Sequence, residues 1–284
     1  MSTQHRSRTR RTPRELFCFR VCHRVQAEVS HRFSLKLSSW ISHAGIFTAT
    51  IKFNQPLSVA WYVASGARVP IGAFQLQRLH VHSKRAYINQ TVAFNITDEA
   101  AFSQFTQAMI MQPNFTWHLS SEKLDVQALK FPTAHGLHFN KDVTLKGMDN
   151  FAGNVKLVDF QLPADDPGGG IEFIATTGLD NPSAFNVDLG TVSFDLSYKG
   201  LYLGTGSGPN TVVQPGANNV TLKGTLVPQN GTENLATVLE LFTQYLNGES
   251  SDVIATGRSS AQSDGSVVSW LSDGFTALQL HVLF

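Results

Sequence analysis

The sequence has 284 residues, 42% of them hydrophobic, which is enough to bury a substantial core and suits two domains better than one. The net charge is +1, but residues 1–44 hold nine Lys or Arg and two acidic residues, whereas the rest of the chain holds 13 basic and 19 acidic residues. Contacts with phosphate need a positive surface, so the acidic body argues against a nucleic-acid-binding globule.

The N-terminal segment, residues 1–32, is highly charged and has little periodicity, which predicts a disordered basic tail. Its Arg- and Ser-rich composition resembles a mitochondrial presequence, and a disordered tail or an incorrectly assigned gene start fits equally well. Both cysteines, Cys18 and Cys22, lie in this segment, so no disulfide is expected in the body. A structural zinc site needs four ligands and no second pair exists, so no metal is expected there.

No transmembrane helix is expected. The uncharged runs 37–51 and 53–67 are 15 residues each, whereas a helix that spans a bilayer needs about 20 mostly apolar residues. The N-terminus also lacks a clear signal peptide. These observations do not select one cellular compartment, and mitochondrial and cytosolic locations are among the alternatives.

From Phe33 onward, apolar and polar residues alternate with the period of half-buried strands. Two-residue hairpins are predicted at Gln77-Arg78 and at Lys199-Gly200. The apolar residues have even numbers before each turn and odd numbers after it, and a two-residue hairpin places such residues on one face of the sheet. In the first hairpin Leu76 is expected to face Leu79.

Each hairpin is followed by a further strand and then by one amphipathic helix. Thr97 is the expected N-cap of the first helix and Thr232 that of the second, and Asn247-Gly248 is expected to end the second helix. The predicted apolar stripes are Phe102, Phe105 and Met109 in the first helix, and Leu235, Val238, Leu239 and Phe242 in the second.

Matching features recur in the same order along the chain. Both predicted helices contain Phe-Thr-Gln, at Phe105 and Phe242, and a Ser-Ser pair follows each helix. This order predicts two tandem units with loop insertions between them, at residues 33–150 and 151–260. Residues 261–284 form a loop and a strand that resembles the start of a further repeat, which leaves two alternatives: a truncated repeat, or a strand that closes a sheet.

The order Asn181-Pro182-Ser183, alternating strand, Tyr198-Lys199-Gly200, strand, helix and closing strand resembles the LEA-type-2 (water-stress, hypersensitive-response) domain. This domain is an immunoglobulin-like β-sandwich with one helix. The passages at 139–148 and 270–284 are similar to a fungal membrane-protein family of unknown function that carries such repeats in tandem. The resemblance covers roughly residues 45–284 and implies a mainly β chain of two tandem LEA-type-2-like β-sandwich repeats, each with one short amphipathic helix.

Members of that family typically have a cytosolic tail, one transmembrane helix and a luminal or extracellular series of repeats. One relative is implicated in vacuolar membrane function and in the ending of autophagy. The resemblance therefore implies an endomembrane or vacuolar lumen, or the cell surface, with a membrane, membrane proteins or a lipid as partners. This chain departs from the family in lacking the transmembrane helix.

Five N-glycosylation sequons occur, where chance alone gives about two or three. Two of them, at Asn89 and Asn230, are expected at strand ends or in loops, and Asn114, in an apolar setting, is expected to be buried and unmodified. The five acceptors are Asn89, Asn95, Asn114, Asn219 and Asn230.

Histidines form two weak candidate groups for a metal. His80 and His82 lie two apart on one predicted strand, and His135 and His138 lie close in sequence. Two histidines without a nearby carboxylate or cysteine are a weak metal signal, and a solvated sheet face is the better interpretation.

Motifs for catalysis or for a cofactor are missing. There is no GxSxG elbow, the glycines at 204, 206 and 208 run into Pro209 rather than opening a helix, and Asp165 and Asp166 lack the spacing of a calcium loop. We therefore expect no enzyme activity and no cofactor. The leading hypothesis is a structural or interaction module at a fungal endomembrane, with an apolar ligand between its sheets. The alternative is a soluble stress-protection or scaffolding protein.

Overall fold

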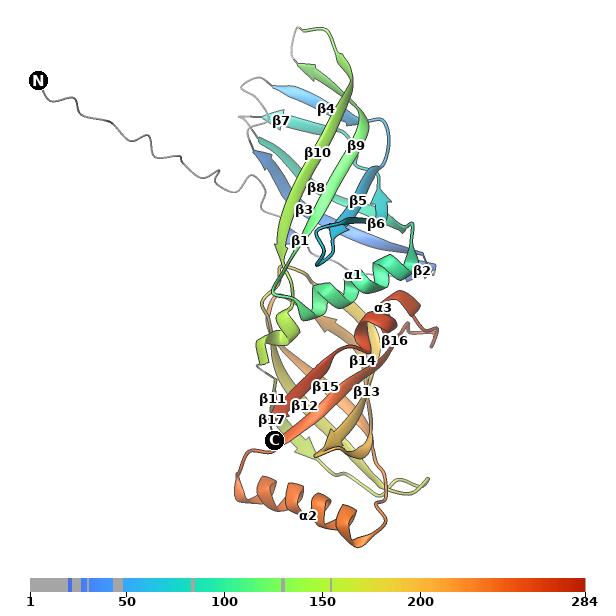
Figure 1. Ribbon diagram of the computed structural model, residues 1–284, viewed down its shortest axis with the longest axis vertical. Helices are drawn as coiled ribbons and strands as arrows, with labels where there is room; N and C mark the ends of the chain where they lie inside the picture. The colour runs from blue at the N-terminus through green and yellow to red at the C-terminus, as the bar shows by residue number, and fades with distance from the viewer. Residues whose placement is uncertain are drawn as a thin grey trace, which may run out of the picture.

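The computed structural model describes residues 20–21, 27–29, 31–42, 48–82, 85–128, 131–153 and 155–283. These residues form an N-terminal sheet of ten strands and a C-terminal closed barrel of seven strands, which follow one another along the long axis of the molecule (Figure 1). The prediction of a mainly β chain is confirmed.

The strands of the N-terminal sheet are all antiparallel and run in the order β1-β3-β8-β6-β5-β9-β4-β7, with β2 beside β3 and β10 beside β9. Because β7 also pairs with β8, the sheet folds back on itself. The bounds are β1 Arg20–Val21, β2 Ala27–Val29, β3 Arg32–Ser42, β4 Ala49–Phe53, β5 Leu57–Tyr62, β6 Arg68–Phe74, β7 Leu79–His82, β8 Arg85–Ile96, β9 Asn114–Ala128 and β10 Ala134–Lys146.

The barrel strands run in the order β11-β12-β15-β14-β13-β16-β17, and β17 returns to β11. This last pairing is parallel and places Leu283 beside Lys156, whereas the other barrel pairings are antiparallel. The bounds are β11 Lys156–Gln161, β12 Ile171–Asn181, β13 Val187–Tyr198, β14 Leu201–Val213, β15 Gly216–Leu226, β16 Asp252–Ala261 and β17 Gln279–Leu283.

Glycines in β14 let this strand pack closely against neighbouring residues of the barrel. Gly204 has a φ of +153°, and a Cβ there would lie 2.0 Å from the carbonyl oxygen of Thr225. A Cβ at Gly206 would lie 3.0 Å from the ring of Phe173, inside the barrel. The glycines at 204 and 206, which the sequence left without a function, therefore serve strand packing.

Three α-helices and one 3-10 helix complete the fold. In α1 (Glu99–Met111) the N-cap is Asp98 rather than the predicted Thr97, since the Asp98 carboxylate accepts a 2.9 Å hydrogen bond from the amide of Ala101. In α2 (Thr232–Asn247) Gly231 occupies the N-cap, and Thr232 is the first helical residue. The bounds of the other two are α3 Ser269–Phe275 and η1 Asp149–Gly153. None of the helices in the described part of the chain is long and apolar enough to span a membrane.

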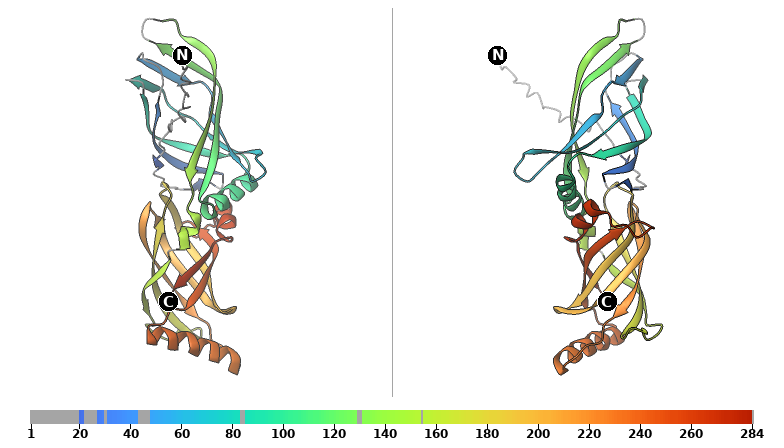
Figure 2. Two further views of the ribbon diagram at one scale, coloured as in Figure 1. Left: turned by 60° about the vertical axis from the view of Figure 1, so that its left-hand side comes forward. Right: turned by 90° about the vertical axis from the view of Figure 1, so that its right-hand side faces the viewer.

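One hydrophobic core runs from the sheet into the barrel. Both views in Figure 2 place α1 against α3 where the two bodies meet. The Trp270 ring of α3 lies 5.1 Å from the ring of Phe102 in α1, and the Ser103 hydroxyl donates a 3.1 Å hydrogen bond to the Trp270 carbonyl. Phe185, which leads into β13, lies 5.7 Å from the ring of Phe115 in β9. The two bodies are therefore joined by packed aromatic side chains.

The turn Asn181-Pro182-Ser183 belongs to this junction. The Asn181 side chain accepts from the amide and the hydroxyl of Ser183 and donates to the Phe185 carbonyl at 2.9 Å. Asn181 and Ser183 are both buried, and together they fix the backbone that delivers Phe185 to the core.

Several local predictions need correction. The second unit, predicted to be a β-sandwich, is a closed barrel, because the final strand pairs with both β16 and β11. The predicted hairpin at Gln77-Arg78 does not form: β6 pairs with β5 and β8, and β7 pairs with β4 and β8. Two pieces of the segment predicted to be disordered, β1 and β2, pair with β3. The predicted hairpin at Lys199-Gly200 is confirmed, with φ values of +50° and +80°.

Candidate functional site

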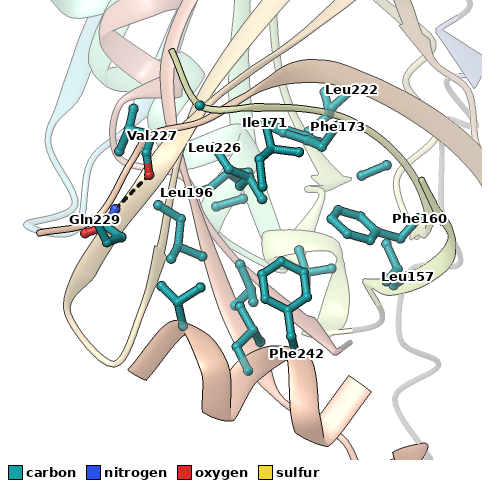
Figure 3. Close-up of a pocket in the computed structure, with 18 of the residues that line it drawn as sticks. Leu157, Phe160, Ile171, Phe173, Leu196, Leu222, Leu226, Val227, Gln229 and Phe242 are labelled. Atoms are coloured by element: carbon teal, nitrogen blue, oxygen red, sulfur yellow. Dashed lines mark hydrogen bonds between the residues drawn. The ribbon is translucent and has the colours of Figure 1, made fainter. Parts of the chain in front are cut away.

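An apolar cavity of about 480 Å³ lies at the end of the barrel that α2 covers (Figure 3). Cavities of this size lie within the range of about 300–1,000 Å³ that holds small ligands. No charged side chain lines it. Most of the lining is aliphatic or aromatic: Leu157, Phe160, Ile171, Phe173, Ala175, Leu196, Leu203, Leu222, Leu226, Val227, Pro228, Leu235, Val238, Leu241, Phe242, Val253, Ala255 and Val282, with Gly170, Thr177 and Gln229 completing it.

The two polar side chains of the lining are engaged by the protein itself. The Thr177 hydroxyl donates to the Val220 carbonyl at 3.3 Å. The side-chain amide of Gln229 donates to the carbonyl of Tyr202 at 3.0 Å. It also donates to the carbonyl of Val227 at 3.2 Å (Figure 3). The cavity therefore offers its occupant almost entirely apolar contact.

Helix α2 is anchored to the barrel through its middle. Leu241 is buried against Tyr198, Leu203 and Val253, and the Tyr198 hydroxyl donates a 3.0 Å hydrogen bond to the side chain of Gln244. Lys199 and Glu240 add an ion pair of 2.5 Å, which raises the pKa of the Lys199 ammonium through the hydrogen bond to Glu240. The predicted end of the helix at Asn247-Gly248 is confirmed, because Gly248 is left-handed at φ +72°.

The exposed side of α2 also carries apolar side chains. Leu239, predicted to belong to the packed stripe, is 67% exposed, and Leu246 is 81% exposed. Leu241 takes the inward position instead. The helix thus presents leucines both to the cavity and to solvent.

A second cluster, which the sequence did not suggest, lies on the N-terminal sheet. Arg68 donates from Nη1 to Nε2 of His118 at 3.0 Å, and because a guanidinium can only donate, this nitrogen must accept. Nδ1 of His118 therefore carries the proton and donates to Asp142 at 2.6 Å. The Tyr62 hydroxyl donates to the same carboxylate at 3.1 Å. The hydrogen bond from His118, followed by that from Tyr62, lowers the pKa of the Asp142 carboxyl.

We expect Asp142→Asn to cost on the order of 1 kcal/mol of unfolding free energy at neutral pH, because it weakens charge-assisted hydrogen bonds at a partly exposed site. The folded-state pKa of Asp142 is lowered, so its contribution is fully present above the ordinary carboxyl pKa and is lost as the pH falls through the folded value. Urea unfolding of both proteins at pH 7 and about pH 3 should show the difference shrinking in acid. An equal cost at both values would contradict this account.

The histidines singled out from the sequence lie on exposed surface, as predicted. His80 Nδ1 lies 3.3 Å from the Thr50 hydroxyl, and His135 Nδ1 lies 3.1 Å from the Asp125 carboxylate. His82 and His138 are exposed. Among the residues that the structure describes, no three His, Cys, Asp or Glu side chains gather as a metal site would require. Cys18 and Cys22 lie outside those residues.

All five sequon asparagines are exposed, including Asn114, which was wrongly expected to be buried. Asn230 lies in the loop before α2, as predicted, whereas Asn89 lies within β8 rather than at a strand end. The other three also lie in strands: Asn95 in β8, Asn114 in β9 and Asn219 in β15.

If the chain is directed into the secretory route by an added signal peptide, we expect it to carry N-linked glycans, and first of all at Asn230. Mass spectrometry before and after treatment with an N-glycosidase measures this. Asn230→Gln should remove one glycan without changing the unfolding temperature, because the side chain is exposed in a loop. An unchanged mass after glycosidase would contradict the prediction.

The geometry defines a β-rich protein with an apolar cavity at one end of a barrel. The family described as "Protein of unknown function (DUF3712)" matches residues 69–196, from β6 to β13, so the matched region crosses the junction between the two bodies. A search of curated proteins gave no match. Among solved structures, the chain is similar to "Biofilm associated protein - BSP domain", with 9% identity and a TM-score of 0.15. The similarity covers 90% of this chain and 59% of that one.

Proposed function

We propose that this protein is a non-enzymatic binding module that holds an apolar ligand, such as the hydrocarbon chain of a lipid, in the barrel beneath α2. The observation that carries the proposal is the cavity of about 480 Å³, whose lining holds no charged side chain. Burial of apolar surface contributes about 25 cal/mol per Å² to binding. The absence of a titratable side chain from the lining leaves no group there for acid-base or nucleophilic catalysis, which favours binding over turnover.

We propose further that the protein works at a membrane surface. The exposed leucines of α2, Leu239 and Leu246, lie on the helix that also lines the cavity, so the same element offers apolar surface on both sides. Insertion of such side chains into the headgroup region is a recognised way for a helix to lie on a bilayer. The resemblance to a fungal membrane-protein family with tandem LEA-type-2-like, immunoglobulin-like repeats supports an endomembrane or vacuolar location, and this finer assignment is part of the proposal.

Ligand binding is tested with the purified full chain. Native mass spectrometry and lipid extraction should reveal a co-purified apolar molecule, and the uncharged dye N-phenyl-1-naphthylamine should become fluorescent on binding. If the chain carries no apolar molecule and the dye does not bind, the proposed function is wrong.

Membrane association is a separate measurement. Flotation with vesicles of zwitterionic phospholipid should carry the chain upward, and Leu239→Ser/Leu246→Ser should reduce the floated fraction. Both residues are exposed, so the variant should keep the dye affinity of the parent chain. Flotation that is absent, or unaffected by the variant, would contradict the membrane part of the proposal alone.

A further inference from the structure

The end of the barrel that opens beneath α2 is strongly acidic. It is built from the β11–β12 loop with the start of β12, the β13–β14 hairpin, and the segment from the end of β15 through α2 to β16, which correspond to residues 162–172, 198–203 and 226–252. These three segments contain seven acidic residues and a single basic residue, Lys199. The acidic residues are Asp165, Asp166, Glu172, Glu233, Glu240, Glu249 and Asp252.

The one lysine of this region is already engaged. Its Nζ lies 2.5 Å from a Glu240 carboxylate oxygen and 5.5 Å from the centre of the Tyr198 ring. Asp252 pairs with His281 at 2.8 Å, whereas Asp165 and Glu233 are exposed. A negatively charged group held among these three segments would therefore meet carboxylates and no unpaired lysine or arginine.

The wall of the cavity also offers no free side-chain donor to an anion. Its polar side chains, Thr177 and Gln229, already donate to backbone carbonyls. A carboxylate drawn inside would lose its hydration without gaining a partner, which is unfavourable unless the group takes up a proton. An anionic head group is thus disfavoured both inside the cavity and at its mouth.

Resting on the proposed function, we propose that the cavity selects single-chain amphiphiles whose head group is uncharged or cationic and discriminates against those with an anionic head. The apolar interior binds the hydrocarbon chain of either kind. The acidic mouth sets the difference between them, because the head group stays there in water while the chain is buried.

The test uses three molecules with the same twelve-carbon chain: dodecanol, dodecyltrimethylammonium and dodecanoate. Each is tested for displacement of N-phenyl-1-naphthylamine from the full chain at pH 8. The two ionic compounds are kept below their micelle-forming concentrations and dodecanol below its solubility limit. At low ionic strength we expect dodecanoate to compete at least about fivefold less well than the other two, and at about 0.5 M salt we expect the gap to narrow, because salt screens charges at a solvated mouth.

Two charge variants test whether carboxylates at the mouth cause the weaker competition by dodecanoate. Asp165→Asn/Glu233→Gln removes two exposed carboxylates from the mouth and should bring dodecanoate closer to dodecanol. Glu122→Gln/Asp180→Asn removes one Glu and one Asp, both exposed, from β9 and from the far end of β12, and should leave the ratio unchanged.

The outcomes separate the two proposals. A chain that does not bind the dye at all overturns the apolar-ligand function, and the selectivity with it. Dye binding in which dodecanoate competes as well as dodecanol, or in which both double variants change the ratio equally, overturns the selectivity and leaves the apolar-ligand function standing.

Discussion

Replacement of Ala175 by phenylalanine should weaken binding of N-phenyl-1-naphthylamine at least tenfold, or about 1.4 kcal/mol. Ala175 lies on β12, is 7% exposed, and lines the cavity. A benzyl group at this position would occupy space that the ligand needs. The unfolding temperature should be unchanged or higher, since filling a void restores packing contacts. Fluorescence titration and thermal unfolding of the same samples measure both effects.

The next residue supplies the matched control. Thr176 lies on the outer face of β12, where its hydroxyl is 3.0 Å from that of Thr221. Thr176→Phe adds the same ring to the outside of the barrel and should keep the affinity of the parent chain. If Ala175→Phe retains full affinity while remaining folded, the dye binds elsewhere and the cavity is not the site.

Truncation of Phe185 to alanine should lower the unfolding free energy by about 3–5 kcal/mol. The side chain is 2% exposed, and its ring lies 5.7 Å from that of Phe115 and 6.3 Å from that of Trp117, both in β9. Because these rings belong to the other body, the loss should destabilise the sheet and the barrel together. Urea unfolding measures the total loss of unfolding free energy. Hydrogen exchange at amides of β8 and β16 shows whether the sheet and the barrel are both destabilised.

A second apolar residue provides the comparison. Val267 is 62% exposed, so Val267→Ala should change the unfolding free energy by less than about 0.5 kcal/mol. Loss of protection in β16 with full protection in β8 would contradict the shared core, since it would mean that the barrel unfolds alone.

The sequence was informative where structure depends on near neighbours. Lys199-Gly200 and Gly248 were predicted correctly because positive φ angles at a hairpin and at a helix end favour particular residues. The hairpin at Gln77-Arg78 was predicted by the same parity rule and is wrong, because Leu79 pairs with Ile51 in β4 instead. Parity shows which residues share a face but does not identify the neighbouring strand.

Such local rules could not predict that the barrel closes. The pairing of Lys156 with Leu283 joins segments more than a hundred residues apart, and the final strand carries the same alternation whether it closes a sheet or begins a new one. The sequence therefore left both alternatives open, and the structure shows that the final strand pairs with β11 and β16 and closes the barrel.

The cavity was harder still to predict. Alternation shows which residues of a strand share a face, but a void arises only where inward side chains such as Phe173 and Leu222 fail to meet. Helical spacing likewise could not separate Leu239 from Leu241 as the buried leucine of α2. His118 and Asp142 escaped notice because their strands, β9 and β10, come together only through pairing.

The position of β17 in the barrel has a consequence for biosynthesis. This strand carries Val282 into the cavity wall and bridges β16 to β11, yet it follows every other barrel strand in the sequence. The barrel cannot close until residues 279–283 have left the ribosome, and until then its apolar interior is open along one side. If the barrel holds an apolar ligand, as we propose, a hydrophobic molecule present during translation would be enclosed as the last strand adds. The ligand of a freshly made chain would then reflect the compartment of its synthesis.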